Sequence, residues 1–409
     1  MSSILKYFFL ICFTVIIYNS LYCQENNYIS ARGTQIIDLE GKPILLKGIN
    51  LGNWLVPEGY FIKFEQISSP TRIYNFFNTL IGPSEARKFW NEYRENYIKI
   101  NDIKKIKELG FNSIRIPFHY SMFFDEDNNK LEGIGYALLD RLVEWCKIES
   151  LYVLLDMHCA PGGQTGDNID DSFGYPFLFD SIEDQKNTIA IWKKLASIYA
   201  NEPIILGYDF LNEPIAHYFD KEKLNPKLEP FFKQLTEEIR TVDKNHLFFI
   251  AGAQWNSDFS VFGAPFDSKL VYTFHKYWSS TTQDVIQNYI DYSNKYEVPI
   301  YLGESGENTN QWIKEFRSVL EKNNIGWCFW PYKKMDSDRC VVSINRTTEF
   351  DSIISFANSK SISYEEIRNN RPNSQIINKA LTDYLENMKL NNCKINYEYL
   401  EALGLKNKQ

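Results

Sequence analysis

Eight short apolar stretches, separated by helix-like segments, constrain the fold of this chain more than any other feature. None of them alternates cleanly between polar and apolar residues, which indicates strands buried on both faces of a parallel sheet. They lie at residues 45–49, 113–117, 152–157, 205–210, 247–251, 270–274, 300–303 and 327–330. Segments with 3.6-residue periodicity lie between most of them, at residues 97–109, 136–148, 184–199, 228–241, 283–296 and 309–322.

This alternation predicts an α/β fold, a single (β/α)8 TIM barrel with an inner closed sheet and an outer ring of helices. No glycine-rich phosphate-binding fingerprint follows the first stretch, which argues against an open nucleotide-binding sheet. Residues 29–49, with a turn at 39–42, predict an N-terminal β-hairpin. Insertions at 68–96 and 159–183 are expected to form long βα loops, which often carry function. A last helix is expected at 380–388.

The first 23 residues have the layout of a secretory signal peptide. One lysine precedes an apolar run at residues 7–18, and a short polar stretch follows. The run is too short for a comfortable transmembrane span, although a retained anchor is the alternative. We therefore expect a signal peptide at 1–23, one folded domain at 24–409, and a secreted (periplasmic or extracellular) protein without stable membrane insertion after cleavage.

The net charge and the cysteines restrict the kinds of ligand that the chain is expected to bind. The formal net charge is −8, so nucleic acid is not an expected partner. Aromatic residues make up 16% of the chain and suit sugar faces as well as protein cores, although genome bias explains their abundance more simply. The five cysteines after residue 23 show no C-x-x-C spacing, so no zinc site is expected. At most two disulfides are possible, and several buried free thiols are expected instead. No metal or cofactor is predicted.

Two acidic residues stand where predicted strands end. Glu213 lies in Gly-Tyr-Asp-Phe-Leu-Asn-Glu-Pro, and Glu304 lies in Pro-Ile-Tyr-Leu-Gly-Glu-Ser-Gly. Reacting groups of a (β/α)8 barrel sit at the C-terminal ends of its strands, and a carboxylate there is costly unless partners or a task retain it. The interval between the two suits the fourth and seventh strands. The pair therefore predicts an acid and a nucleophile.

Other strand ends supply residue types that suit hydrolysis of a glycosidic bond, which needs two carboxyl groups. Arg115 is predicted to hold Glu304 ionised, and Tyr277 is predicted to donate a hydrogen bond to it. Asn212 is placed to reach a sugar hydroxyl, and Trp330 to form a floor under the ring. Further polar or aromatic residues at strand ends are Asn50, Asn53, Trp54, His119, His158, His275 and Trp278. For His119 a core position is the equal alternative, and His217 and His246 are expected to be ordinary surface or loop residues.

Taken together, these residues resemble glycoside hydrolase family 5, the cellulase-type barrel enzymes of clan A, over residues 32–332. The resemblance implies that Glu213 is the acid/base and Glu304 the nucleophile. It also implies a substrate-binding set of Arg115, His158, Asn212, His275, Tyr277, Trp330 and Trp54. The motifs that carry it are Leu-Lys-Gly-Ile-Asn-Leu-Gly-Asn-Trp, Ile-Arg-Ile-Pro, Leu-Asp-Met-His, Leu-Asn-Glu-Pro, His-Lys-Tyr, Gly-Glu and Trp-Cys-Phe-Trp. Their style is most similar to the exo-β-glucanase and β-glucosidase branch, with departures at Cys159 and residues 167–174.

The expected function is a secreted retaining β-glycosidase that hydrolyses β-1,4- or β-1,3-glucan by double displacement, with a polysaccharide or oligosaccharide as its partner. The same mechanism on β-mannan, xyloglucan or another β-glycoside is one alternative. An inactive carbohydrate-binding barrel is another, and a metal-dependent hydrolase is disfavoured because the first strand end lacks a His-x-His pair. Exo or endo action and oligomeric state stay open.

Overall fold

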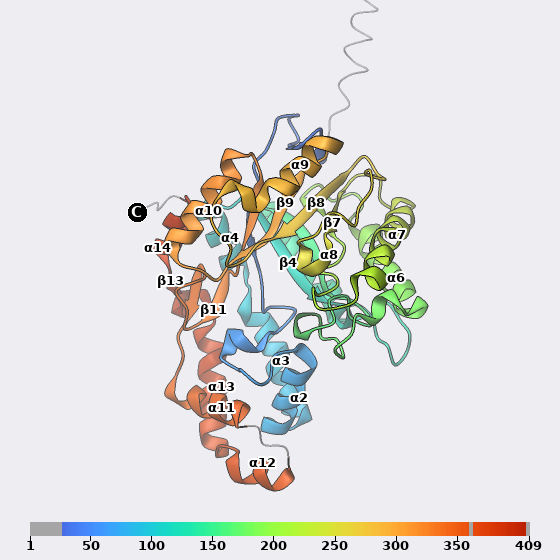
Figure 1. Cartoon of the computed structure of the whole chain (residues 1–409). Coiled ribbons are helices and arrows are strands. Elements are labelled where there is room, and N and C mark those ends of the chain that lie inside the picture. Colours follow the sequence, from blue (N-terminus) through green and yellow to red (C-terminus); the bar gives the residue numbers. More distant parts are fainter. Residues whose placement is uncertain (1–26, 360–362, 406–409) are drawn as a thin grey trace, which may run out of the picture.

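A parallel barrel forms the centre of the molecule. The computed structural model describes residues 27–359 and 363–405, so the expected signal peptide lies outside the described residues. Eight parallel strands close into a barrel, in which the last strand pairs with the first (Figure 1). They are β3 (Lys47–Asn50), β4 (Ser113–His119), β5 (Tyr152–Cys159), β6 (Ile205–Asp209), β7 (Leu247–Ala251), β8 (Leu270–His275), β9 (Ile300–Gly306) and β10 (Gly326–Trp330). The predicted fold class is confirmed.

Amphipathic helices cover the outside of the barrel at the predicted places. They are α4 (Ile100–Glu108), α5 (Ile134–Glu149), α6 (Ile182–Tyr199), α7 (Lys221–Arg240), α9 (Gln287–Tyr296) and α10 (Asn310–Lys322). Helix α7 begins seven residues before its predicted start, and both Pro226 and Pro230 lie inside it. The side chain of Asp220 accepts a hydrogen bond from the Lys223 amide and caps this earlier start.

The first insertion is helical rather than a long loop, which corrects our expectation. Helices α2 (Pro70–Ile81) and α3 (Pro83–Tyr97) each begin with proline at a first-turn position, where its missing N–H costs nothing. Their aromatic faces pack together, as in the stacked pair Phe77 and Phe89, whose ring centroids lie 4.8 Å apart. The second insertion does form a long loop, in which short helices η3 (Asn168–Asp170) and η4 (Phe177–Phe179) occur.

Short elements close the two ends of the chain around the barrel. Strands β1 (Ser30–Arg32) and β2 (Gln35–Ile37) form a hairpin with its turn at residues 33–34. The predicted turn at 39–42 is also present, because the Asp38 amide donates to the Lys42 carbonyl at 2.8 Å and Ile37 pairs with Pro43 in an antiparallel bridge. At the other end a three-stranded sheet joins β11, β12 and β13, and α13 packs against α3 (Figure 1). These C-terminal elements are β11 (Lys333–Met335), β12 (Val342–Ile344), α11 (Thr348–Asn358), α12 (Tyr364–Asn370), α13 (Ser374–Asn387), β13 (Lys394–Ile395) and α14 (Tyr397–Ala402). The helix expected at 380–388 is the second half of α13.

Two further expectations concern cysteines and membranes. All five cysteines of the described residues carry free thiols, and four of them are buried, as expected for small apolar side chains. No helix within residues 27–359 or 363–405 combines the length and the apolar character of a membrane span.

A buried ion pair fastens the added helices to the barrel. The Lys333 ammonium donates to Asp102 Oδ1 at 2.7 Å, to the Tyr97 carbonyl at 2.6 Å and to the Met388 carbonyl at 2.9 Å. Both charged side chains are essentially inaccessible to solvent. All three ammonium donors are therefore used at a point where α3, α4, β11 and the end of α13 meet.

We expect Lys333→Met to destabilise the fold by roughly 3–5 kcal/mol, because it leaves the Asp102 carboxylate buried without its cation. The free energy of unfolding is to be measured by urea denaturation. The matched control is Lys379→Met, which removes a solvent-exposed ion pair with Asp383 and is expected to leave the midpoint unchanged. Equal stability of the two variants would contradict this account of Lys333.

Candidate active site

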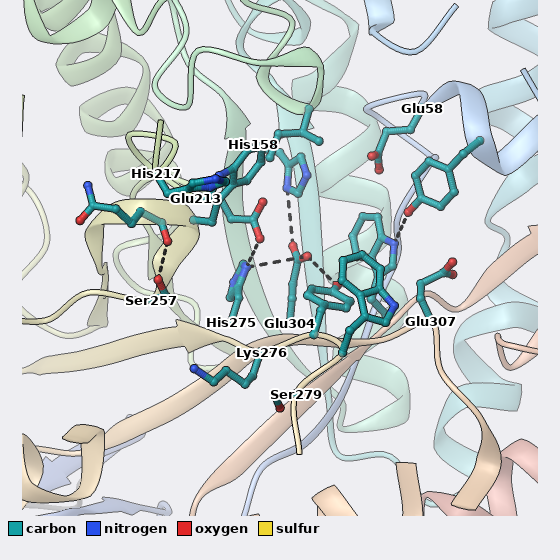
Figure 2. Close-up of a pocket in the computed structure, with 17 residues that line it drawn as sticks. Glu58, His158, Glu213, His217, Ser257, His275, Lys276, Ser279, Glu304 and Glu307 are labelled. Atoms are coloured by element: carbon teal, nitrogen blue, oxygen red, sulfur yellow. Dashed lines mark hydrogen bonds and ion pairs between the residues drawn. The ribbon is translucent and has the colours of Figure 1, made fainter. Parts of the chain in front are cut away.

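The C-terminal ends of the barrel strands surround a cavity of about 820 Å³. Figure 2 shows Glu304 at its centre, with Glu213, His158 and His275 directed towards the same space. The residues of the predicted set that line the cavity are Glu213, Glu304, His158, His275, Tyr277 and Trp330. The strand ends therefore converge as a barrel requires, although they lie far apart in the sequence.

The two carboxyl groups face each other across this cavity. Glu213 follows β6 and is 9% exposed, and Glu304 lies within β9 and is 5% exposed. One carboxylate oxygen of each, together with a ring nitrogen of His275, lie within 4.8 Å of one another. Retaining glycosidases hold their two carboxyl groups about 5–5.5 Å apart, whereas inverting ones leave about 6.5–9.5 Å for a water molecule. The spacing suits direct attack by one carboxylate.

Arg115 and Tyr277 contact Glu304 as predicted. Arg115 Nη1 donates to Glu304 Oε1 at 2.5 Å, and the Tyr277 hydroxyl donates to Oε2 at 3.1 Å. Both bonds favour the ionised carboxylate. Arg115 is fully buried on β4, so its guanidinium needs carboxylate partners, and Glu304 is one of them.

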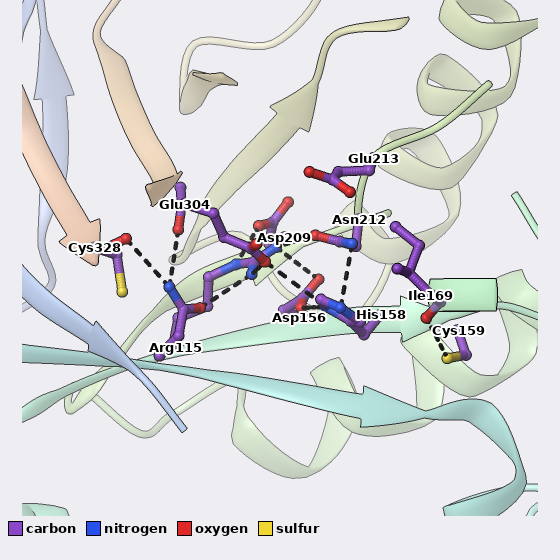
Figure 3. Close-up of polar contacts among 12 residues, drawn as sticks. Arg115, Asp156, His158, Cys159, Ile169, Asp209, Asn212, Glu213, Glu304 and Cys328 are labelled. Atoms are coloured by element: carbon purple, nitrogen blue, oxygen red, sulfur yellow. Dashed lines mark hydrogen bonds and ion pairs between the residues drawn. The ribbon is translucent and has the colours of Figure 1, made fainter. Parts of the chain in front are cut away.

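Two further partners of Arg115 escaped the sequence analysis. Arg115 Nε donates to Asp209 Oδ2 at 2.8 Å, and Nη2 lies 3.1 Å from Asp156 Oδ1 (Figure 3). Both aspartates are fully buried, on β6 and β5. A signal was present, because each is the one acid within an apolar strand and Arg115 is the one arginine on such a strand.

Asn212 lies behind the cavity wall rather than on it. Its side-chain oxygen accepts from Arg115 Nη2 at 3.0 Å, and its Nδ2 lies 3.3 Å from His158 Nε2. Gln164 Nε2 donates to the backbone carbonyls of both His158 and Asn212 at 2.8 Å and fixes the loop after β5 to the loop after β6. The contact of Asn212 with a sugar hydroxyl stays a prediction.

Electrostatics separate the two carboxyl groups. Burial, and next the charge of Glu304, raise the pKa of Glu213 well above its ordinary value. Burial also raises the pKa of Glu304, but the Arg115 guanidinium opposes this rise. The proton therefore resides on Glu213, whose Oε1 lies 2.8 Å from His275 Nδ1. Burial lowers the pKa of His158 to about 4 and that of His275 well below its usual range, so both rings are neutral at neutral pH.

The two tryptophans of the predicted substrate-binding set have different positions. Trp330 lines the cavity, stacks on His158 at 5.7 Å between ring centroids, and donates from Nε1 to the Tyr60 hydroxyl at 2.6 Å. Trp54 is only 1% exposed, lies outside the cavity and donates from Nε1 to the Arg94 carbonyl of α3. The prediction that Trp54 binds substrate is wrong for this reason: the first insertion folds over it as helices.

Several cavity residues carried no recognisable sequence signal. Glu58 is 4% exposed, and its Oε1 has no hydrogen-bond partner among the described residues. Glu307 also lines the cavity and pairs with Lys334 at 2.7 Å. On the Glu213 side, Trp255 Nε1 donates to His217 Nδ1 at 3.1 Å. The positions of these side chains depend on loop geometry, which periodicity does not report.

The three histidines outside the predicted site occupy different environments. His217 is exposed, as expected, yet it lines the cavity. His246 lies in the loop before β7, one of the two places expected for it, but it is buried there, with Nδ1 2.6 Å from Asp243 Oδ2. His119 accepts from the Ser121 amide at 3.1 Å and lies outside the cavity, which favours the core alternative that we had considered for it.

Comparison with known proteins agrees with this geometry. Residues 75–336 match the model of cellulase, glycosyl hydrolase family 5. A β-xylosidase of Phanerodontia chrysosporium is 32% identical over 238 residues, which are 58% of this chain and 48% of that protein, so the chain spans about half of that relative. Endoglucanase C of Acetivibrio thermocellus is 27% identical over 318 residues, covering 62% of this chain and 89% of the relative. A glucan 1,3-β-glucosidase 2 of Candida albicans is 34% identical over 205 residues, 43% of this chain and 41% of the relative.

Solved structures share the fold. The crystal structure of AoRut superposes with a TM-score of 0.58 at 19% identity, covering 71% of this chain and 89% of that one. The crystal structure of an endogalactoceramidase superposes with a TM-score of 0.57 at 20% identity, covering 74% of each chain. With the family match extending over most of the barrel and the two carboxyl groups at its mouth, the chain belongs to glycosyl hydrolase family 5, the cellulase family.

Proposed function

We propose that this protein is a secreted retaining β-glycosidase that hydrolyses β-glucans. The observation that carries the proposal is the carboxyl pair: one oxygen of Glu213 lies within 4.8 Å of one oxygen of Glu304, and Arg115 binds the Glu304 carboxylate. Burial and the charge of Glu304 raise the pKa of Glu213, which suits it to carry the proton. Relatives named as an endoglucanase and a glucan 1,3-β-glucosidase support glucan as the substrate class. The signal-like sequence of residues 1–23 supports secretion.

In the first step the Glu304 carboxylate attacks the anomeric carbon. The bond from that carbon to the glycosidic oxygen breaks, and the departing oxygen takes the proton of Glu213. Arg115 and Tyr277 hold the two oxygens of Glu304 in place, so the attacking carboxylate has one orientation. The products of this step are a glycosyl ester on Glu304 and an ionised Glu213.

In the second step Glu213 acts as a base. Esterification removes the charge of Glu304, which is one of the causes of the high pKa of Glu213, so Glu213 remains ionised long enough to accept a proton from water. The water attacks the anomeric carbon, the ester bond breaks and Glu304 leaves as a carboxylate. Two inversions give a sugar with its original β configuration, and Glu213 is protonated again.

The walls of the cavity offer both stacking and hydrogen bonding to a sugar. Trp330, Tyr60 and Trp278 provide aromatic faces, and Glu58 and Glu307 provide acceptors for hydroxyl groups. In Figure 2 these two acids lie to one side of Glu304, and His217 and Ser257 lie to the other. A sugar on the first side and a leaving group on the second would place the glycosidic oxygen near Glu213.

Glu304→Gln is expected to lower kcat on an aryl β-glucoside by more than about a thousandfold, because the amide cannot form the glycosyl ester. Initial rates of chromophore release measure this. Glu315→Gln, a change to an exposed glutamate on α10, is the matched control and should retain full activity. Near-normal turnover by Glu304→Gln would refute the assignment of the nucleophile.

The pH dependence of kcat/KM is expected to be bell-shaped. Activity rises as pH passes the pKa of Glu304, which must be ionised, and falls as pH passes the raised pKa of Glu213, which must be protonated. Glu213→Gln should abolish the falling limb on an activated aryl glucoside, since that substrate needs little acid assistance. An unchanged falling limb in this variant would assign the acid to another group.

A hydrolysis screen over laminarin, mixed-linkage glucan, cellulose, mannan and xyloglucan tests the substrate class. We expect the greatest reducing-sugar release from one of the three glucans, with equal rates in the presence and absence of a chelator. Preference for mannan or xyloglucan would retain the mechanism and change the sugar. Binding without turnover on all five would contradict the proposal and favour a carbohydrate-binding protein.

A further inference from the structure

The Arg115 guanidinium is shared among three carboxylates that come from three different strands. Nε bonds to Asp209 on β6, Nη2 faces Asp156 on β5, and Nη1 bonds to Glu304 on β9, at 2.8, 3.1 and 2.5 Å. Figure 3 shows the three acids grouped around Arg115. Only Glu304 reaches the cavity, and both aspartates are fully inaccessible to solvent.

This arrangement matters when Glu304 reacts. An ester carries no charge, so the guanidinium loses the partner on its cavity side once the sugar is attached. A buried cation without a partner is strongly unfavourable. If Glu304 were the sole partner of the cation, their strong attraction would make the carboxylate a poorer nucleophile. Ionised carboxylates behind the guanidinium remove both difficulties, because Arg115 then has a partner before and after the bond forms.

We propose that Asp209, together with Asp156, is a positioning residue that balances the charge of Arg115 while Glu304 carries the sugar. The inference rests on the proposed function. Asp209 gives the cleaner test, since its side chain has Arg115 Nε as its partner and its Oδ1 has no hydrogen bond within the described part of the chain. Asp156 has a second task, because its Oδ2 lies 2.7 Å from His158 Nδ1.

Other titratable groups surround Arg115 and its carboxylate partners, but they do not supply a negative charge behind the guanidinium. His158 and His275 are neutral because burial lowers their pKa, and burial keeps the pKa of Tyr277, Tyr301 and Cys328 above their ordinary values. Glu213 and Glu58 lie on the cavity side, and burial raises the pKa of both. Behind the guanidinium, the carboxylates in contact are Asp209 and Asp156.

The charge on the two aspartates gives the proposal a pH signature. Burial raises the pKa of Asp209 to about 7 and that of Asp156 to about 7, while Arg115 opposes the rise. Below a pH of about 7, Asp209 is protonated and, like an asparagine, carries no charge. Above that pH, the wild-type side chain is negatively charged and the asparagine of Asp209→Asn is not. The disadvantage of Asp209→Asn should therefore grow as pH rises through about 7.

The experiment measures how fast 2,4-dinitrophenyl 2-deoxy-2-fluoro-β-glucoside forms the covalent adduct, from pH 5 to pH 9. Its leaving group needs little acid assistance, and loss of the Glu213 proton at high pH slows both proteins alike, so it cancels in the ratio of their rates. We expect the rates of adduct formation by wild type and Asp209→Asn to differ little at pH 5 and by about tenfold or more at pH 9. A difference of this size corresponds to the loss of a charge-assisted hydrogen bond. Asp102→Asn, which alters a buried ion pair remote from the cavity, should show a ratio that does not change with pH.

A constant ratio of the two rates across the pH range in folded Asp209→Asn would overturn the inference and reduce Asp209 to a structural role. If Asp209→Asn does not fold, Asp156→Asn perturbs the same guanidinium and must show the same rise in the ratio with pH. Failure of the proposed function looks different, because the wild-type protein would then form no adduct at any pH, and the inference would be refuted with it.

Discussion

The buried guanidinium of Arg115 is the interaction on which the rest of the site depends. It donates hydrogen bonds to Asp209, Glu304 and the side-chain oxygens of Asn50 and Asn212, and it forms an ion pair with Asp156. A cation without partners would be costly at this position, so Arg115 links the strands that supply its partners. The same contacts hold the nucleophile Glu304 in place.

Glu213 and Glu304 differ in the groups that surround them. Glu304 receives the cation and a tyrosine hydroxyl, whereas Glu213 has a neutral His275 beside it and the charge of Glu304 opposite. Both are almost equally buried, so burial alone does not distinguish them. The difference in partners places the proton on Glu213, and that difference disappears when Glu304 is esterified. A change of role from acid to base follows from the same contacts.

The sequence predicted the barrel and much of its mouth because strand ends can be located by the loss of apolar character. Glu213, Glu304 and Arg115 were visible as charged residues at or within apolar runs. Asp156 and Asp209 carried the same signal as Arg115, a single charge within an apolar run, but they lie inside their strands and not after the strand ends. Trp54 was misplaced for another reason: the 68–96 insertion folds into helices that bury it, and single-residue patterns do not report what a distant segment will cover.

Loop residues such as Glu58, Glu307 and Trp255 could not have been found from periodicity, although they line the cavity where a substrate would bind. The double-displacement mechanism is tested most directly by the configuration of the first sugar released. Proton NMR of a β-glucoside reaction within the first minutes distinguishes the two anomers before mutarotation. The carboxyl spacing predicts β-glucose as the initial product. Initial formation of the α anomer would contradict attack by Glu304 and with it the account given for the whole site.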